Sequence, residues 1–339
     1  MHIKTRASPH STAGQAARPA TYAALDLGTN NCRLLVAQPC GQGFEVVDSF
    51  SRIVRLGEGL ARSGQLDEEA IQRALSALHV CSGKLRRHLP RTLRAVATEA
   101  CRRARNGSLF LDRVRRETGL DIEVITPREE AELAVEGCIA LLDPAVPHAL
   151  VIDIGGGSTE VMWLSMGTGP TPELVDSLSL PTGVNTLTDL HGSDPCAEAY
   201  DGIRRGLVDA LEAFEARHAI RGRIGAGGVQ MVGTSGTVTT LAAAHLDLPR
   251  YTRDRIDGTR LSLDAALAVC RRFLDLGDAG RRAHPCIGPV RGAFVMAGCA
   301  IFEAVCETWP VASFTVADRG LREGMLLRMM GIRPRYGAR

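Results

Sequence analysis

The chain has 339 residues, of which 45% are apolar, and its formal net charge is +2. This length suits about two domains with real cores, and the near-neutral charge argues against capture of nucleic acid as the main function. Only Lys4 and Lys84 are lysines, so almost every cation is an arginine, which either binds phosphate or carboxylate groups or is simply solvated. Chemistry that needs an active-site lysine, such as Schiff-base formation, is excluded.

The cysteines, histidines and apolar runs indicate the compartment. Ten cysteines occur without a C-x-x-C pair, and nine histidines form no zinc-binding pattern. Isolated cysteines in apolar segments are typical of the core of a protein in a reducing compartment. No apolar run of about 18 residues is evident, so we expect a cytoplasmic protein with no membrane partner. Residues 1–20 are expected to form a disordered arm.

The first predicted strand ends in an acidic, glycine-containing loop. Residues 22–27 are mainly apolar, and strands over 33–37 and 44–54 complete a meander. A helix over 66–89 and a strand over 93–97 follow, and this strand leads into a helix start at 98–106. Because open α/β sheets bind ligands at the carboxyl ends of their strands, the arginines of that helix start, Arg102 and Arg103, either bind a ligand or form a solvated face.

A strand over 122–125 leads into a well-marked helix start. Thr126 is the expected N-cap, Pro127 occupies the first helical position, and Glu129 is placed to complete a capping box with the N-cap N–H group. Glu130 has no comparable structural role. It either belongs to the polar margin of an amphipathic helix or is free for chemistry.

Residues 150–164 repeat the design of the first loop. Asp153 lies at the end of a β-branched strand, as Asp26 does, and follows it by 127 residues. The glycines after Asp153 either serve only to reverse the chain or leave backbone N–H groups free to bind an anion. Two loops of one design indicate domain duplication rather than a solenoid.

The remaining elements continue an alternating pattern of strands and helices. A strand over 231–235 leads through Gly236 into a helix that starts at Thr237 and covers 237–246. The turn between them either binds an anion at the helix N-terminus or only allows the strand and helix to pack closely. The other predicted elements are a strand over 173–178, a glycine turn at 181–185, helices over 195–217, 261–274 and 292–307, a strand over 311–316 and a closing helix over 319–330.

Six short motifs occur in order along the chain: 26–31 (DLGTNN), 97–106 (ATEACRRARN), 128–133 (REEAEL), 151–160 (VIDIGGGSTE), 233–237 (GTSGT) and 318–324 (DRGLREG). Together they resemble the signatures of the exopolyphosphatase / guanosine pentaphosphate phosphohydrolase (Ppx/GppA) family. The resemblance implies an α/β fold of two ribonuclease-H-like domains of the actin-like ATPase superfold, facing each other across an interdomain cleft. The domains are expected at 21–134 and 135–318, with the closing helix, 319–331, packing back on the first.

The same resemblance assigns roles to residues. It implies that Glu130 is the catalytic base, that Asp153 and Glu160 position Mg²⁺ (or Mn²⁺) and the attacking water, and that Arg102 holds the terminal phosphates. This sequence departs from the common family pattern at Thr29, Asn31 and Arg319. The expected phosphate-binding residues are Asp26, Gly28, Thr29, Asn30, Asn31, Arg102, Gly155, Gly156, Gly157, Ser158, Gly236 and Thr237.

The expected activity is processive release of orthophosphate from the ends of inorganic polyphosphate. Guanosine pentaphosphate (pppGpp) is the alternative substrate, and guanosine tetra- or pentaphosphate is a candidate inhibitor. A small-molecule kinase of the same superfold and a non-catalytic alarmone sensor are more distant alternatives; the retained Glu130 argues against the sensor. A homodimer is also expected from the resemblance.

Overall fold

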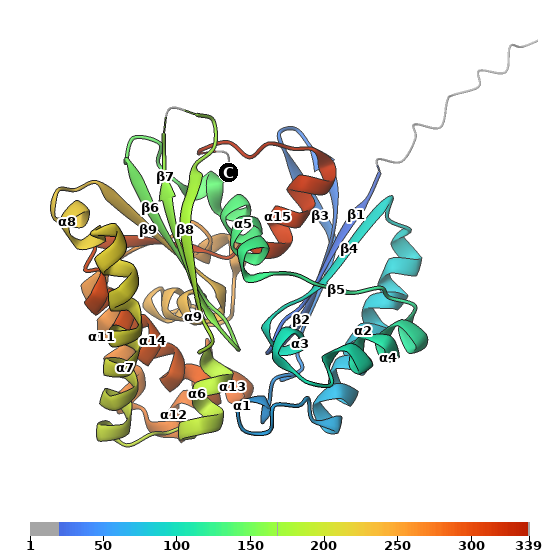
Figure 1. Ribbon diagram of the computed structural model, residues 1–339, viewed down its shortest axis with the longest axis horizontal. Coiled ribbons are helices and arrows are strands. Elements are labelled where there is room, and N and C mark those ends of the chain that lie inside the picture. Colours follow the sequence, from blue (N-terminus) through green and yellow to red (C-terminus); the bar gives the residue numbers. More distant parts are fainter. Residues whose placement is uncertain (1–19, 168, 338–339) are drawn as a thin grey trace, which may run out of the picture.

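Two twisted sheets form the framework of the computed structural model, which describes residues 20–167 and 169–337 (Figure 1). The expected arm at 1–20 lies outside the described residues except for its last residue. The first sheet has the order β3-β2-β1-β4-β5 and the second the order β10-β11-β9-β6-β7-β8. The first contains β1 (Tyr22–Leu27), β2 (Asn31–Cys40), β3 (Gly43–Ile53), β4 (Thr92–Ala97) and β5 (Glu123–Val124). The second contains β6 (His148–Ile154), β7 (Thr159–Ser165), β8 (Glu173–Leu180), β9 (Val229–Thr234), β10 (Arg260–Ser262) and β11 (Ser313–Ala317).

The two sheets have the same topology. Each begins with three antiparallel strands, β1-β2-β3 or β6-β7-β8, and continues on the other side of the first strand with two parallel strands. This is the ribonuclease-H-like arrangement, present twice. The predicted duplication and the predicted two-domain fold of the actin-like superfold are therefore confirmed; only the short edge strand β10 breaks the equivalence.

Helices cover the outer face of each sheet, and α5 and α15 lie between the sheets (Figure 1). The first sheet is covered by α2 (Glu68–His88) and α4 (Gly107–Thr118), with the short α1 (Leu60–Ser63) and α3 (Glu99–Arg103) nearby. The second half contains α6 (Val184–His191), α7 (Ala197–His218), α8 (Ile220–Gly225), α9 (Ser235–His245), α10 (Arg253–Ile256), α11 (Leu263–Asp275), α12 (Gly277–Ala283), α13 (Gly288–Arg291), the 3₁₀ turn η2 (Gly292–Phe294) and α14 (Val295–Thr308). The central helices are α5 (Pro127–Cys138), followed by the 3₁₀ turn η1 (Ile139–Leu141), and α15 (Leu321–Met330).

The central strands are apolar on both faces because both faces are covered. In β1, Leu25 packs in the core beneath the outer helices, whereas Ala24 packs toward α15. In β6, Ile152 packs beneath the outer helices, whereas Val151 packs toward α5. Since side chains alternate along a strand, the next inward-facing positions of β1 and β6 are those of Asp26 and Asp153.

The start of α5 differs in one respect from the prediction. Thr126 is the N-cap and its hydroxyl accepts a bond of 3.2 Å from the Glu129 N–H group, as expected. The Glu129 carboxylate, however, bonds the Arg94 guanidinium on β4 instead of returning to the N-cap. An ionic partner within reach competes with the neutral N–H group for the carboxylate, so only half of the capping box forms.

α5 and α15 cross with their backbones in contact. A Cβ atom added to Gly324 would lie 2.0 Å from the Leu133 carbonyl oxygen, and one added to Gly137 would lie 2.1 Å from the Gly320 oxygen. The expected domain boundary between residues 134 and 135 falls inside α5. The apolar side chains of α5 pack mainly against the second sheet, whereas Leu133 packs with β1 and α15, so the helix contacts both halves.

One apolar stretch qualifies as a membrane span by length and composition, contrary to the sequence-based expectation. This stretch, Gly288–Thr308, comprises α13, η2 and α14, and its most apolar window is 72% buried. Its residues Ala300 and Val305 belong to the core of the second half. It packs here as a core helix of that half.

The glycine contact between the central helices predicts a stability effect. Gly324→Ala should lower the free energy of unfolding by about 1–3 kcal/mol, because the methyl group overlaps the α5 backbone. The matched control is Gly206→Ala in α7, where the added Cβ meets nothing, and it should be stabilising by about 0.5–1 kcal/mol. Urea unfolding measures both; equal effects of the two variants would contradict the packing described here.

Candidate active site

The loops that follow β1 and β6 have the same backbone geometry. In the first, the Gly28 N–H group donates to the Asn31 oxygen at 2.9 Å; in the second, the Gly155 N–H group donates to the Ser158 oxygen at 3.0 Å. The first glycine of each loop is therefore not a free donor, which corrects one part of the expected anion site. Within the described part of the chain, the N–H groups of Gly156, Gly157 and Ser158 make no hydrogen bond and remain available to a ligand.

The two loops touch each other across the cleft between the sheets. A Cβ atom added to Gly157 would lie 2.4 Å from the Thr29 hydroxyl oxygen, and one added to Gly156 would lie 2.8 Å from the Asn30 Cβ. Glycine is required at both positions because any side chain would separate the loops. The contact places both predicted phosphate loops at one site.

A cavity of about 130 Å³ lies where the two loops meet α5 and the connection from β11 to α15. Six carboxylates line it: Asp26, Glu130, Asp153 and Glu160, which were predicted site residues, and Asp318 and Glu323 near the start of α15. Arg102 and Thr237 do not line it, and Thr237 faces an adjoining pocket instead. The predicted site residues that do line the cavity are Asp26, Gly28, Thr29, Asn30, Asn31, Glu130, Asp153, Gly155, Gly156, Gly157, Ser158, Glu160 and Gly236.

Arg102 lies behind Glu130 rather than in the cavity. Its guanidinium donates to Glu130 Oε2 at 3.1 Å, to the Ile125 oxygen at 2.7 Å and to Glu99 Oε2 at 2.8 Å. A guanidinium held by three acceptors orients the carboxylate it bonds. Arg102 thus positions Glu130 in this structure. The resemblance had implied that Arg102 itself contacts the substrate.

The predicted site carboxylates Asp26, Glu130, Asp153 and Glu160 affect one another's pKa values. Burial, with further contributions from Asp26 and Asp153, raises the pKa of Glu130 to about 8 against the opposing effect of Arg102. Burial raises the pKa of Asp153 to about 6, and that of Glu160 is raised by burial and then by the charges of Glu130 and Asp153. Ionisation of the cluster is therefore shifted to higher pH, and a cation in the cavity would favour the ionised carboxylates.

The two hairpins differ in charge at one equivalent position. Asp26 pairs in register with Arg33, whereas Asp153 pairs with Glu160, and each partner lies seven residues after its aspartate. Directly opposed side chains on a sheet face are close neighbours. The first hairpin therefore supplies its own cation, and the second places two carboxylates side by side.

The second hairpin fits a hard divalent cation. Oxygen ligands of this kind suit Mg²⁺ or Mn²⁺. Among residues 20–167 and 169–337, no three His, Cys, Asp or Glu side chains are grouped closely enough to hold an ion alone. Mg²⁺ commonly binds through one or two carboxylates together with water and substrate phosphates, so Asp153 and Glu160 satisfy the protein's share of such a site.

Four arginines line the cavity, Arg33, Arg291, Arg319 and Arg322, and the sequence motifs assigned a ligand-binding role to none of them. Arg33 could have been found from its spacing, since it follows Asp26 as Glu160 follows Asp153. The others come from segments with no counterpart in the two loops.

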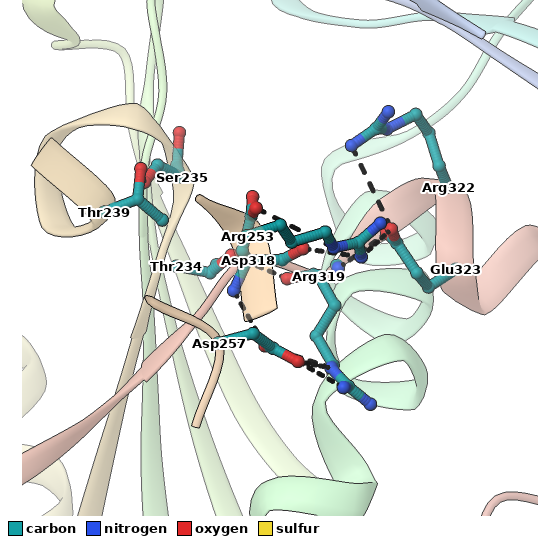
Figure 2. Close-up of polar contacts among 10 residues, drawn as sticks. Thr234, Ser235, Thr239, Arg253, Asp257, Asp318, Arg319, Arg322 and Glu323 are labelled. Carbon is teal, nitrogen blue, oxygen red and sulfur yellow. Dashed lines mark hydrogen bonds and ion pairs between the residues drawn. The ribbon is translucent and has the colours of Figure 1, made fainter. Parts of the chain in front are cut away.

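The connection before α15 is fixed by ion pairs (Figure 2). The Arg319 guanidinium bonds the Asp257 carboxylate, with its Nε 3.0 Å from Oδ2, and the Arg319 carbonyl accepts a bond of 2.7 Å from the Thr234 hydroxyl. This ties the connection to β9 and to the residue after α10. Arg319 therefore anchors the wall of the cavity.

Ser235 adopts a strained backbone conformation at the edge of the cavity. Its φ of 79° is in the left-handed region, which residues other than glycine rarely adopt. Its side chain hydrogen-bonds Asp153, which opposes the effect of burial on the pKa of that aspartate. Such strain persists where the surroundings impose it, and it occurs here against a carboxylate of the site.

A second pocket adjoins the cavity and has a mixed lining, polar where it meets the cavity and apolar elsewhere. Its apolar lining comes mostly from the second half and includes Leu241, Phe273 and Phe294. It shares Asn30 and Gly156 with the cavity. A ligand with phosphates in the cavity could therefore extend an uncharged group into this pocket.

A sequence model described as the Ppx/GppA phosphatase family matches residues 35–332 of the chain. The chain is 31% identical to exopolyphosphatase 2 of Mycobacterium tuberculosis, with 91% of the chain and 98% of that protein covered. It is 29% identical to a guanosine-5'-triphosphate,3'-diphosphate pyrophosphatase of Photobacterium profundum over 91% of the chain, which spans only 59% of that longer relative.

Solved structures agree with these sequence matches. The Ppx/GppA enzyme of Aquifex aeolicus has a TM-score of 0.74 at 29% identity, covering 91% of this chain and 99% of that one. An exopolyphosphatase from Cytophaga hutchinsonii has a TM-score of 0.82 at 25% identity, covering 92% and 98% of the two chains.

The carboxylate cluster predicts a pH-dependent stability effect. The pKa of Glu130 is higher in the folded state than its ordinary value, so ionisation of this group disfavours folding as pH rises from about 4.5 to 8. In metal-free and phosphate-free protein, Glu130→Gln should melt close to wild type at pH 5 and a few degrees (~2–8 °C) higher at pH 8. Thermal unfolding at both pH values measures this.

Glu129→Gln is the control, because the Glu129 carboxylate bonds Arg94 outside the cavity. If Glu130→Gln melted at or below the wild-type temperature at pH 8, the prediction would be wrong.

Proposed function

Because the chain belongs to the Ppx/GppA phosphatase family, whose members hydrolyse phosphoanhydride bonds, we propose that it releases orthophosphate from the ends of inorganic polyphosphate. The observation that carries the proposal is the position of Glu130, whose carboxylate lines the same cavity as the two phosphate loops. The similarity to exopolyphosphatase 2 over nearly the whole of both chains supports polyphosphate as the first substrate to test.

The residues of the cavity suit hydrolysis by water. The free N–H groups of Gly156, Gly157 and Ser158 hold the terminal phosphoryl group. Glu130 orients a water molecule and accepts its proton as the water oxygen attacks phosphorus, and the shortened polyphosphate leaves on the opposite side. Arg102 fixes the orientation of Glu130 through the bond at 3.1 Å.

A divalent cation held at Asp153 and Glu160 would neutralise charge on the phosphoryl oxygens. Without such a cation, the raised pKa values of these carboxylates keep part of the cluster protonated. Substrate and cation therefore favour each other's binding, since each offsets charge of the other. The same neutralisation lowers the pKa of Glu130 and frees it to accept a proton.

The contact between the loops supports attack at chain ends. Thr29 and Gly157 are in contact, which closes one side of the cavity. We therefore expect one terminal phosphoryl group to enter it. The rest of the chain would extend outward and remain bound through charge, which favours successive cleavage without release. Because this hold is ionic, processivity should fall as ionic strength rises.

The adjoining pocket makes pppGpp a specific second candidate. Its apolar lining, which includes Phe273 and Phe294, suits a nucleoside attached to phosphates in the cavity. The relative from Photobacterium profundum carries the name of such an enzyme. Phosphate release from uniform polyphosphate and from pppGpp, measured side by side, decides between them; release from neither would refute the proposed function.

The assignment of the base predicts opposite outcomes for two adjacent glutamates. Glu130→Gln should lower kcat by about 10²–10⁴-fold, because glutamine cannot accept the proton. Glu129→Gln should stay within a few fold of wild type (~2–3-fold), since its side chain bonds Arg94 and lies outside the cavity. Steady-state phosphate release measures both, and a reversed order would show that Glu130 is not the base.

The metal assignment predicts loss of activity on chelation. Exhaustive removal of divalent ions should abolish phosphate release, and Mg²⁺ or Mn²⁺ should restore it, because carboxylate oxygens prefer hard cations. Asp153→Asn should raise the Mg²⁺ concentration needed for half-maximal activity. Titration of the chelated enzyme with each ion measures this; full activity in the chelated enzyme would rule the assignment out.

A further inference from the structure

Arg322 occupies an unfavourable position for a cation. It is the second residue of α15, where the free N–H groups of the first turn already carry partial positive charge. Anionic side chains normally occupy such positions, and Glu323 follows this rule. A helix that places an arginine here gives up local stability, and natural sequences break such rules mostly at functional sites.

Arg322 also lacks a full partner within the described residues. Its Nη2 atom lies 4.0 Å from Glu323 Oε1, and it makes no hydrogen bond there. Glu323 is already engaged, since it accepts a bond of 2.8 Å from Arg253 and one of 3.0 Å from the Gly320 N–H group. Figure 2 shows the Arg322 guanidinium apart from the other ion pairs, with one dashed contact to Glu323.

Two nearby arginines provide a contrast. Arg319 is paired with Asp257, and Arg253 bonds both Glu323 and the Asp318 carbonyl, the latter at 2.7 Å. Both therefore have fixed structural partners. Arg322 is only 15% exposed, yet the face it leaves open lines the cavity. A nearly buried guanidinium without acceptors is costly unless a ligand supplies them.

The charges around Arg322 act on it in both directions. Burial lowers the pKa of Arg322, and the cations Arg33 and Arg253 lower it further, whereas Glu323 and Asp26 raise it. Glu323 is shared with Arg253, and its nearest oxygen is 4.0 Å from the Arg322 guanidinium. The side of Arg322 that faces the cavity is therefore open to an anion.

We propose that Arg322 binds a phosphate group of the substrate in the cavity. A guanidinium offers two parallel N–H donors to phosphate oxygens, so the contact fixes position as well as charge. The phosphate would also relieve the repulsion between Arg322 and Arg33. This proposal rests on the proposed function for the nature of the ligand, but the binding it describes does not require turnover.

The test measures binding of inorganic tripolyphosphate with Mg²⁺ by calorimetry. The full-length chain carries Glu130→Gln, which suppresses hydrolysis, and is compared with and without Arg322→Gln. The second substitution should weaken binding by about ten- to a hundred-fold, as expected for loss of a hydrogen bond to a charged group. The affinity of Arg322→Lys for tripolyphosphate should lie between those of the parent and Arg322→Gln, because lysine keeps the positive charge but lacks the two parallel N–H donors of the guanidinium. In the otherwise wild-type chain, Arg322→Gln should raise KM for polyphosphate far more than it lowers kcat.

Arg328→Gln is the matched control. Arg328 lies on the same helix and pairs with Glu136 of α5 at 2.7 Å, outside the cavity. This variant should lower the melting temperature and leave tripolyphosphate binding unchanged, which separates a loosened helix from a lost ligand contact. Binding by Arg322→Gln within two-fold of its parent would overturn the proposal. If Arg322→Gln does not fold, Arg322→Lys decides: weaker binding supports the proposal and unchanged binding overturns it.

The two proposals fail in different ways. If wild type binds tripolyphosphate but releases no phosphate from polyphosphate or pppGpp, the proposed function is wrong. The effect of Arg322→Gln on tripolyphosphate binding then still tests the role of Arg322. If wild type hydrolyses substrate while Arg322→Gln binds tripolyphosphate as tightly as its parent, the function stands and the role of Arg322 is wrong.

Discussion

The backbone contact between α5 and α15 is the constraint on which the site depends. Gly324 against Leu133, and Gly137 against Gly320, allow the two helices to lie closer than side chains would permit. α5 carries Glu130, and two of the four arginines that line the cavity, Arg319 and Arg322, lie just before and within the first turn of α15. Because each helix also packs on a sheet, the crossing fixes Glu130 and these two arginines relative to the loops after β1 and β6.

Duplication followed by divergence of charge explains how one hairpin design serves two purposes. Both hairpins have the same turn, the same inward-facing aspartate and the same cross-strand register. Arg33 balances Asp26, whereas Glu160 adds to the charge of Asp153. The first hairpin is thereby suited to an anion, and the second to a cation that itself binds anions. A phosphate-bearing ligand with a divalent cation between the two hairpins would meet complementary charge on both sides.

The charges that line the cavity lower the stability of the ligand-free fold and favour the binding of phosphate and a divalent cation. Buried carboxylates with raised pKa values, a strained Ser235 and an Arg322 that makes no hydrogen bond within the described residues each disfavour the ligand-free fold. Phosphate and a divalent cation would relieve all the charge terms together. The large cores beneath the outer helices supply the stability that tolerates this arrangement.

The sequence by itself determined most of the strands and long helices, the duplication and the two loops, because alternation, glycine spacing and capping are local properties of the chain. It did not predict the short elements α8, α10 and β10. It also predicted different environments for Glu129 and Glu130; the structure places Glu130 in the cavity, and Arg94 rather than the N-cap holds Glu129. Only the tertiary structure decided that Arg102 supports Glu130 and that Arg322 faces the cavity. The partners of a long charged side chain depend on which distant strands and helices meet around it, and spacing along the chain does not encode that meeting.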